Sequence, residues 1–205
     1  VLSDEVDALN KGIPVPLFSA MQLPGGYQES NEDVAYALTG IFKQALRLGG
    51  KQAADLRRGI LHMVSEGTYH TDGIAGLKDI LQFVDSSSAV RVEDKLQPIF
   101  NHNIFIDGNF IKNGKINIVR LSAFDLDTQG IISEILLSYL WRKAQAGAFI
   151  EAPVWVYCDE CQNLNLGVTG VLPKILSEGR KLGLNLILIT QRIEDPKFKS
   201  FTQAG

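Results

Sequence analysis

The chain has 205 residues, 45% of them hydrophobic and 21% charged, which is typical of a globular protein with a buried core and excludes disorder for most of its length. Its 20 Lys and Arg and 23 Asp and Glu residues give a net charge of −3, which provides no global sign of nucleic-acid binding. Because no apolar run approaches the roughly 18 residues of a membrane span and no signal-peptide pattern opens the sequence, we expect a cytoplasmic protein without membrane contact.

The first 29 residues are interrupted by proline and glycine, which prevent long elements there. The pattern predicts a short helix from Leu2 to Leu9. It also predicts a strand from Ile13 to Phe18, of the edge type that tolerates Pro14 and Pro16.

A run of helices is predicted next. Ser30 or Asn31 is a suitable N-cap, acidic residues follow in the first turn, and apolar residues recur at helical spacing until Gly49 and Gly50. Three more helices are expected, over residues 52–65, 76–84 and 92–100. Together they predict a helical lobe or insertion over residues 1–100. Lys51, Arg57 and Arg58 are candidates for polyanion contact, although a solvated helix face is the favoured interpretation.

After Asn101 the apolar period becomes two. Asp107-Gly108 and Asn113-Gly114 are hairpin signals, so the sequence predicts a small β-meander. An apolar helix over residues 128–146 follows, and then a strand (154–158), a helix (169–182) and a second strand (184–190). Apolar strands that alternate with helices predict an α/β fold with a parallel sheet and flanking helices over residues 101–205.

Polar residues follow the last two predicted strands, at their carboxyl ends. Asp159 and Glu160 follow the first strand, and Thr190 and Gln191 end the second. Ligands of open parallel sheets bind beyond these ends, so the four side chains are expected to converge. Asp159 is suited to contact Mg²⁺, Glu160 to deprotonate an attacking water, and Gln191 to sense a phosphate or position that water.

Two segments, VWVYCDE and EGRKLGLNLILITQR, resemble the HerA and FtsK group of RecA-like P-loop ATPases. That group pumps DNA and includes conjugative coupling proteins and secretion ATPases. The resemblance runs from Val154 to Arg192, and the helical lobe is similar only in its placement. It implies that VWVYCDE is the Walker B motif, with Asp159 as the magnesium contact and Glu160 as the catalytic base.

The same resemblance implies further roles and partners. Arg180 would act as an arginine finger on the ATP of a neighbouring subunit, Gln191 as the sensor, and Thr190 beside it in the nucleotide site. A salt bridge from Arg180 to Glu178 or Asp195 is the competing interpretation. ATP and Mg²⁺ are the implied cofactors. Double-stranded DNA is the implied partner, and a hexameric ring of identical subunits is the implied assembly.

The sequence departs from this family at the phosphate-binding loop. G-x-x-x-x-G-K-[ST] is absent, and the nearest approaches, Gly108 to Lys115 and Leu48 to Lys51, lack required residues. The expectation is therefore a fragment of the ATPase motor of a DNA translocase or helicase, inactive in isolation, whose loop lies upstream of Val1. The alternatives are a conjugation or secretion ATPase, and an interaction module that keeps the fold without hydrolysis.

Cys158 and Cys161 form a C-x-x-C pair, which permits redox chemistry or half a zinc site. A second such pair is missing, and the three histidines are far away in the sequence. Buried packing is therefore the favoured interpretation for both cysteines, and also for Trp155, which lies in the middle of a predicted strand.

Overall fold

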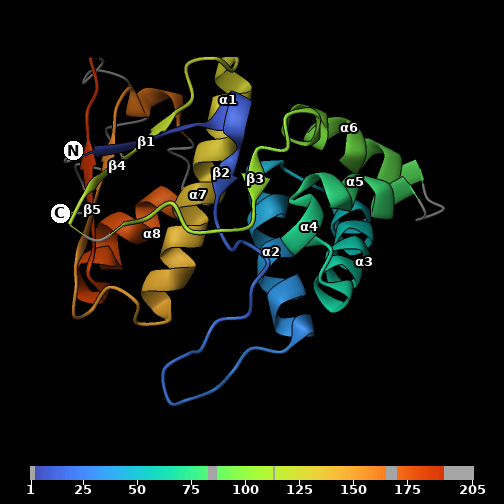
Figure 1. Cartoon of the computed structure of the whole chain (residues 1–205), viewed down its shortest axis with the longest axis horizontal. Coiled ribbons are helices and arrows are strands. Elements are labelled where there is room, and N and C mark those ends of the chain that lie inside the picture. Colours follow the sequence, from blue (N-terminus) through green and yellow to red (C-terminus); the bar gives the residue numbers. More distant parts are fainter. Residues whose placement is uncertain (1–2, 83–86, 113, 165–169, 192–205) are drawn as a thin grey trace. The chain divides into compact units, whose positions relative to one another are not determined.

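The computed structural model describes residues 3–82, 87–112, 114–164 and 170–191, and these form a mixed α/β protein (Figure 1). The chain divides into two compact units, one of Val1–Ala20 and Glu29–Gln129, the other of Met21–Gln28 and Gly130–Gly205. The division falls inside helix α7 (Leu126–Gln145). The predicted domain boundary near residue 101 stays a prediction.

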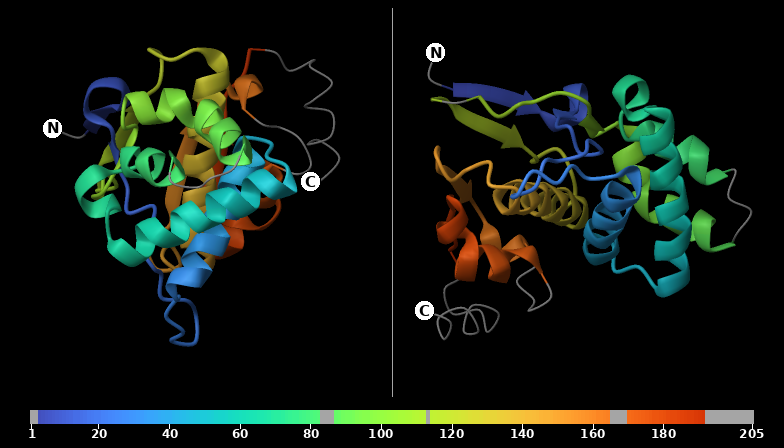
Figure 2. Two further views of the ribbon diagram at one scale, coloured as in Figure 1. Left: turned by 90° about the vertical axis from the view of Figure 1, so that its right-hand side faces the viewer. Right: turned by 90° about the horizontal axis from the view of Figure 1, so that it is seen from below.

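The first unit contains the helical lobe, and the four helices predicted for it are confirmed. Helix α3 contacts α2, α5 and α6, and Figure 2 shows the helices side by side. A short helix, α4, was not predicted. The bounds are α2 (Asn31–Ala45), α3 (Gly50–Glu66), α4 (Tyr69–Asp72), α5 (Ala75–Gln82) and α6 (Ser87–Asn101).

Ser30, one of the two predicted candidates, is the N-cap of α2. Its Oγ accepts a hydrogen bond from the Asp33 amide at 3.2 Å, and the Asp33 carboxylate accepts one from the Ser30 amide at 2.9 Å. This reciprocal capping box satisfies amides that the first helical turn leaves without partners. Gly49 does not end α2, because that helix ends at Ala45; it is the N-cap of α3 instead.

The helix predicted from Leu2 to Leu9 is wrong. Ser3–Asp7 forms strand β1, and only Ala8–Lys11 is helical, as α1. The Asp7 carboxylate accepts hydrogen bonds from the amides of Leu9 and Asn10, so Asp7 is an N-cap that ends the strand and begins the helix.

The predicted meander is also wrong. Strand β3 (Phe105–Ile106) pairs in parallel with β2 (Ile13–Pro14), and β4 (Ile116–Arg120) pairs in parallel with β1. Alternating apolar residues therefore reflect pairing with the distant N-terminal segment instead of a local hairpin. Asn113 lies outside the described residues. Strand β2 is shorter than predicted, because Pro14 and Pro16 have no amide hydrogen to donate.

The elements predicted for the second unit are confirmed, with adjusted ends. Strand β5 has the predicted bounds, and β6 is two residues shorter than predicted. The helix predicted over residues 169–182 is an α-helix, α8, followed by a 3₁₀ turn. Residue 169, where that helix was expected to begin, lies outside the described residues. The bounds are β5 (Val154–Cys158), the 3₁₀ turn η1 (Cys161–Asn163), α8 (Val171–Glu178), the 3₁₀ turn η2 (Gly179–Leu182) and β6 (Leu184–Leu188).

Parallel pairing, which an α/β fold requires, is thus present in all the described strand pairs. The described strands form three separate two-stranded sheets, β1–β4, β2–β3 and β5–β6, so a continuous RecA-like sheet stays a prediction. No helix in the described part of the chain is both long and apolar enough to cross a membrane.

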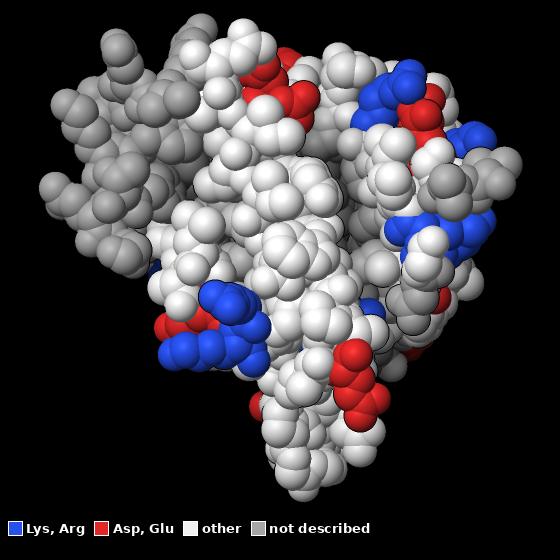
Figure 3. All heavy atoms as spheres, turned by 90° about the vertical axis from the view of Figure 1, so that its left-hand side faces the viewer, with Lys and Arg blue, Asp and Glu red and all other residues white. Residues whose placement is uncertain are grey.

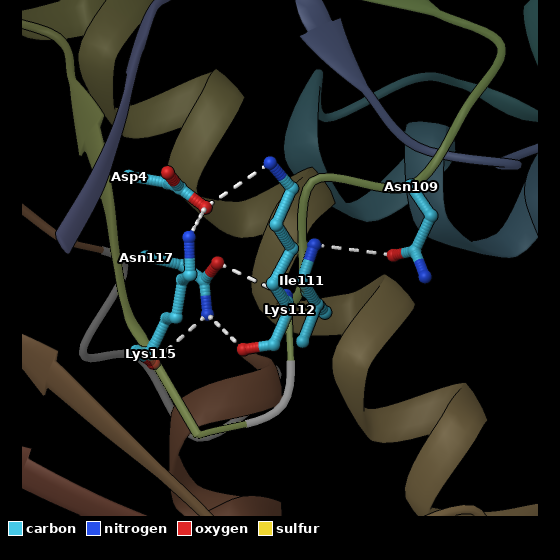
Figure 4. A network of polar contacts seen from close by, with 6 residues as sticks. All are labelled: Asp4, Asn109, Ile111, Lys112, Lys115 and Asn117. Carbon is cyan, nitrogen blue, oxygen red and sulfur yellow. Dashed lines mark hydrogen bonds and ion pairs between the residues drawn. The ribbon is translucent and has the colours of Figure 1, made fainter. Parts of the chain in front are cut away.

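The β1–β4 sheet is bordered by paired charges. The Asp4 carboxylate lies 3.1 Å from the Lys112 ammonium and 3.4 Å from that of Lys115 (Figure 4). Arg120 pairs with Glu5 across the same two strands. On the face that Figure 3 shows, Lys and Arg side chains of the described residues stand in small groups next to acidic ones, so opposite charges neutralise one another locally.

Replacing Asp4 tests this pairing. The Lys112 ammonium, with a smaller contribution from Lys115, holds the pKa of the Asp4 carboxyl below its usual range. Stabilisation by a lowered carboxyl pKa is present above the unfolded-state pKa and is lost as the pH falls through the folded-state pKa. We expect Asp4→Asn to lower the urea midpoint at pH about 7 and to have a smaller effect at pH about 2, where less of the carboxylate is ionised.

Asp79→Asn is the matched control, because Asp79 is exposed on α5 and has no ion pair among the described residues. It should leave the midpoint unchanged at both pH values. An equal loss of stability for Asp4→Asn at both pH values would contradict the ionic origin of the effect.

Gly183 allows β6 to start beside the end of η2. Its φ is +76°, and a methyl group there would overlap the carbonyl oxygen of Phe149. The Gly183 carbonyl accepts a hydrogen bond from the Val154 amide at 2.8 Å, which fixes the beginning of β5. The residue therefore sets the register of the β5–β6 sheet.

We expect Gly183→Ala to lower the free energy of unfolding of the second unit by about 3 kcal/mol, from the left-handed backbone and the steric overlap together. Gly147→Ala, in the same unit, separates the backbone effect from the overlap, because Gly147 has a φ of +82° and its added methyl group would make only an ordinary contact with Ile150. That control should lose only about 1 kcal/mol. Equal losses in chemical denaturation would show that the overlap is not present.

Candidate functional site

The parallel register of β5 and β6 brings the polar strand ends together. Val154 is opposite Leu184, and Cys158 is opposite Leu188. Beyond the strands, the Ile189 amide donates to the Cys158 carbonyl at 2.9 Å, and the Cys161 amide donates to the Ile189 carbonyl at 3.0 Å. Asp159 and Glu160 therefore lie at the same edge as Thr190 and Gln191.

Glu160 makes the chain turn sharply at this edge. Its backbone is left-handed (φ 50°, ψ 40°), which is uncommon for a residue other than glycine, and it directly precedes η1. The Asp159 carboxylate accepts a hydrogen bond from the Glu160 amide at 2.9 Å. Such conformations persist where the surroundings enforce them, and they are frequent at functional sites.

The Glu160 carboxylate has an amide donor at each oxygen. Gln191 Nε2 donates to Oε1 at 2.9 Å, and Gln162 Nε2 donates to Oε2. The Thr190 hydroxyl in turn donates to Gln162 Oε1 at 2.7 Å. The structure thus brings together Glu160, Thr190 and Gln191, and it adds Gln162, which was missed. The sequence signal that could have indicated Gln162 is its position two residues after Glu160.

Asp159 is exposed at the turn. Its carboxylate and that of Glu160 are the acidic oxygens that follow β5, and Mg²⁺ in phosphoryl-transfer sites takes one or two carboxylates together with water and phosphate oxygens. The residues therefore fit the metal and water part of a nucleotide site. No cluster of three or more His, Cys, Asp and Glu side chains suited to a metal is found in the described ranges.

Arg180 lies on η2, and no hydrogen bond joins it to Glu160 or Gln191 among the described residues. Its side chain is exposed. Within the described residues it has no ion pair with Glu178, and Asp195, the other predicted partner, lies outside them, as does Arg192. The guanidinium group is therefore accessible, and its role as an arginine finger stays a prediction.

Helix α8, which leads to Arg180, has an unusual cap. Its N-cap, Gly170, has no side chain, and the Val171 amide donates to the buried Glu134 carboxylate of α7 at 3.0 Å. A carboxylate at a helix N-terminus is favoured by the helix dipole. Glu134 thus fixes the position where α8 begins.

The two approximations to a phosphate-binding loop have other structures. Residues 108–115 connect β3 with β4, and the Asn117 side chain bonds the backbone of Lys112 and Lys115 (Figure 4). Leu48 and Gly49 lie between α2 and α3, and Gly50 and Lys51 begin α3. Neither segment joins a strand to a following helix, as a P-loop does.

Trp155 was predicted to be buried, and this is wrong. Its side chain is 59% exposed and that of Tyr157 is 67% exposed, because both point to the same open face of β5. The alternation of exposed and half-buried residues along β5 shows that one face of this strand is covered better than the other.

Part of the chain is similar to a DNA repair helicase. The relative is the DNA double-strand break repair helicase HerA of Sulfolobus acidocaldarius, with 35% identity over 97 residues. This match covers 41% of the chain and 19% of the relative, so the chain spans about a fifth of that protein's length. No protein-family model matches the chain. The similarity relates this part of the chain to a part of the HerA helicase.

The two cysteines beside the acidic turn are both free thiols. Cys161 is fully buried and Cys158 is half-buried. Burial, followed by the nearby Cys161, raises the pKa of Cys158 to about 11. Burial also raises the pKa of Cys161, and the charges of Glu160 and Asp159 act in the same direction. Since the thiolate is the reactive and metal-binding form, these shifts favour a packing role.

We expect both thiols to react slowly with an aromatic disulfide reagent in the native protein near pH 7.5, because the thiol form predominates when the pKa is raised. The rate should increase as the pH rises toward the pKa. Unfolding in urea should make both thiols react rapidly, and this serves as the control. Rapid labelling of the native protein would contradict the buried, protonated state.

Proposed function

We propose that the chain is part of the ATPase motor of a DNA-translocating or helicase-type ring ATPase. The hydrogen bond from Gln191 to Glu160 at 2.9 Å carries the proposal, because it joins the end of β6 to the acidic turn after β5. An acid and an amide at neighbouring strand ends are the groups that ATP hydrolysis needs to hold a water. The similarity to the HerA helicase supports the same function.

In this proposal the side chains at the strand ends divide the work. Asp159 would hold Mg²⁺, and the ion would neutralise part of the phosphate charge. The Glu160 carboxylate orients the attacking water and takes its proton. Gln191 senses the γ-phosphate, and the Thr190 hydroxyl lies next to it in the nucleotide site.

Arg180 is proposed to act on a neighbouring subunit. Its exposed guanidinium on η2 is able to reach a phosphate outside its own chain, and such a contact requires an oligomer. A hexameric ring around double-stranded DNA is the proposed assembly. A conjugation or secretion ATPase would use the same residues in the same way.

A second candidate function rests on the missing loop. The sequence contains no G-x-x-x-x-G-K-[ST], whose amides and lysine hold phosphates in P-loop ATPases. An interaction module that keeps the strands without hydrolysis would also have this sequence. Hydrolysis of ATP by the full-length protein separates the two functions.

We expect the full-length protein to hydrolyse ATP with Mg²⁺, faster when DNA is present. Glu160→Gln should reduce kcat by about a hundredfold or more, because an amide does not take a proton from water, while ATP binding is retained. Glu151→Gln, on an exposed residue before β5, is the control and should retain full activity. If Glu160→Gln retains activity, Glu160 is not the catalytic base.

A further inference from the structure

We infer that Gln162 is a positioning residue for the Glu160 carboxylate. The inference rests on the proposed function, in which Glu160 takes a proton from water. Gln162 lies on η1, two residues after Glu160, and its side chain is half-buried. It contacts Glu160 on one side and Thr190 on the other.

Chemistry fixes which way the Gln162 amide points. An ionised carboxylate only accepts hydrogen bonds, so the NH₂ group of Gln162 must be the end that faces Glu160. The carbonyl oxygen Oε1 then faces Thr190, whose hydroxyl donates to it at 2.7 Å. Both ends of the amide are thus bonded, and Thr190 prevents the amide from turning away from Glu160.

The two amides that hold Glu160 differ in their surroundings. Gln191 is exposed and bonds Oε1, whereas Gln162 is half-buried and bonds Oε2. Gln191 is therefore the partner that is free to leave when a phosphate requires its amide. After it leaves, Oε1 is available to accept a proton, and Gln162 still holds Oε2.

Such a hold matters because Glu160 has a long side chain and is only half-buried. Without a second contact it would occupy several rotamers, and fixing a rotamer-rich side chain has an entropic cost. A carboxylate that is already held in one conformation loses no further conformational entropy when the substrate binds. Misplacement of a catalytic group by about 1 Å lowers the rate by up to a hundredfold.

The test uses the full-length protein and measures kcat and KM for ATP. Gln162→Ala should lower kcat by about tenfold to a hundredfold and leave KM nearly unchanged, since the residue acts through Glu160. Gln162→Glu keeps the shape but places a second negative charge beside Glu160, so kcat should fall at least as far. Asn163→Ala is the matched control, on the adjacent exposed residue of the same turn, and should be like wild type.

Thr190→Val tests the anchor independently. It should lower kcat in the wild-type background and have no further effect on kcat in Gln162→Ala, because the hydroxyl holds the Gln162 amide; an effect on KM would instead report the proposed place of Thr190 in the nucleotide site. Circular dichroism melting of each variant checks that it folds. If Gln162→Ala does not fold, the loss of kcat without a change in KM in Thr190→Val decides the question.

The outcomes separate the inference from the function on which it rests. A Glu160→Gln variant that remains active overturns the proposed function. If Glu160→Gln is inactive while Gln162→Ala has the kcat of Asn163→Ala, the positioning role is overturned and the function stands. Additive losses from Thr190→Val and Gln162→Ala would also overturn it.

Discussion

The parallel register of β5 and β6 determines where every side chain at the strand ends lies. Side chains alternate between the two faces of a strand, so a shift of one residue would turn each of them to the opposite face. Gly183 sets this register, because it permits the chain to pass the Phe149 carbonyl and leaves its own carbonyl for Val154. The pairing then continues through Ile189 into the acidic turn.

Side-chain hydrogen bonds also join the end of β6 to the turn after β5. The bonds from Gln191 to Glu160 and from Thr190 to Gln162 both cross from the end of β6 to the turn after β5. Bonds to a carboxylate are stronger than bonds between neutral groups. Because one carboxylate receives amides from both segments, a change at the end of β6 is transmitted directly to Glu160.

Local signals predicted the elements that depend on local contacts. The capping residues of α2 and the bounds of β5 could be read from the sequence, since a capping box and an apolar strand are formed by neighbouring residues. The pairing of β1 with β4 could not, because its partners are far apart in the chain. Hairpin signals such as Asp107-Gly108 describe a turn, and they do not determine which strands pair beyond it.

The candidate site was predictable to the same extent. Glu160, Thr190 and Gln191 come together, with Asp159 at the same edge, because the ends of parallel strands share an edge, which is a general rule that needs no coordinates. Gln162 follows no such rule. Its role depends on the left-handed backbone of Glu160, which turns η1 so that an amide two residues later reaches back to the carboxylate. The spacing of two residues does not by itself show that the Gln162 amide reaches the Glu160 carboxylate. That contact follows only once the turn at Glu160 is known.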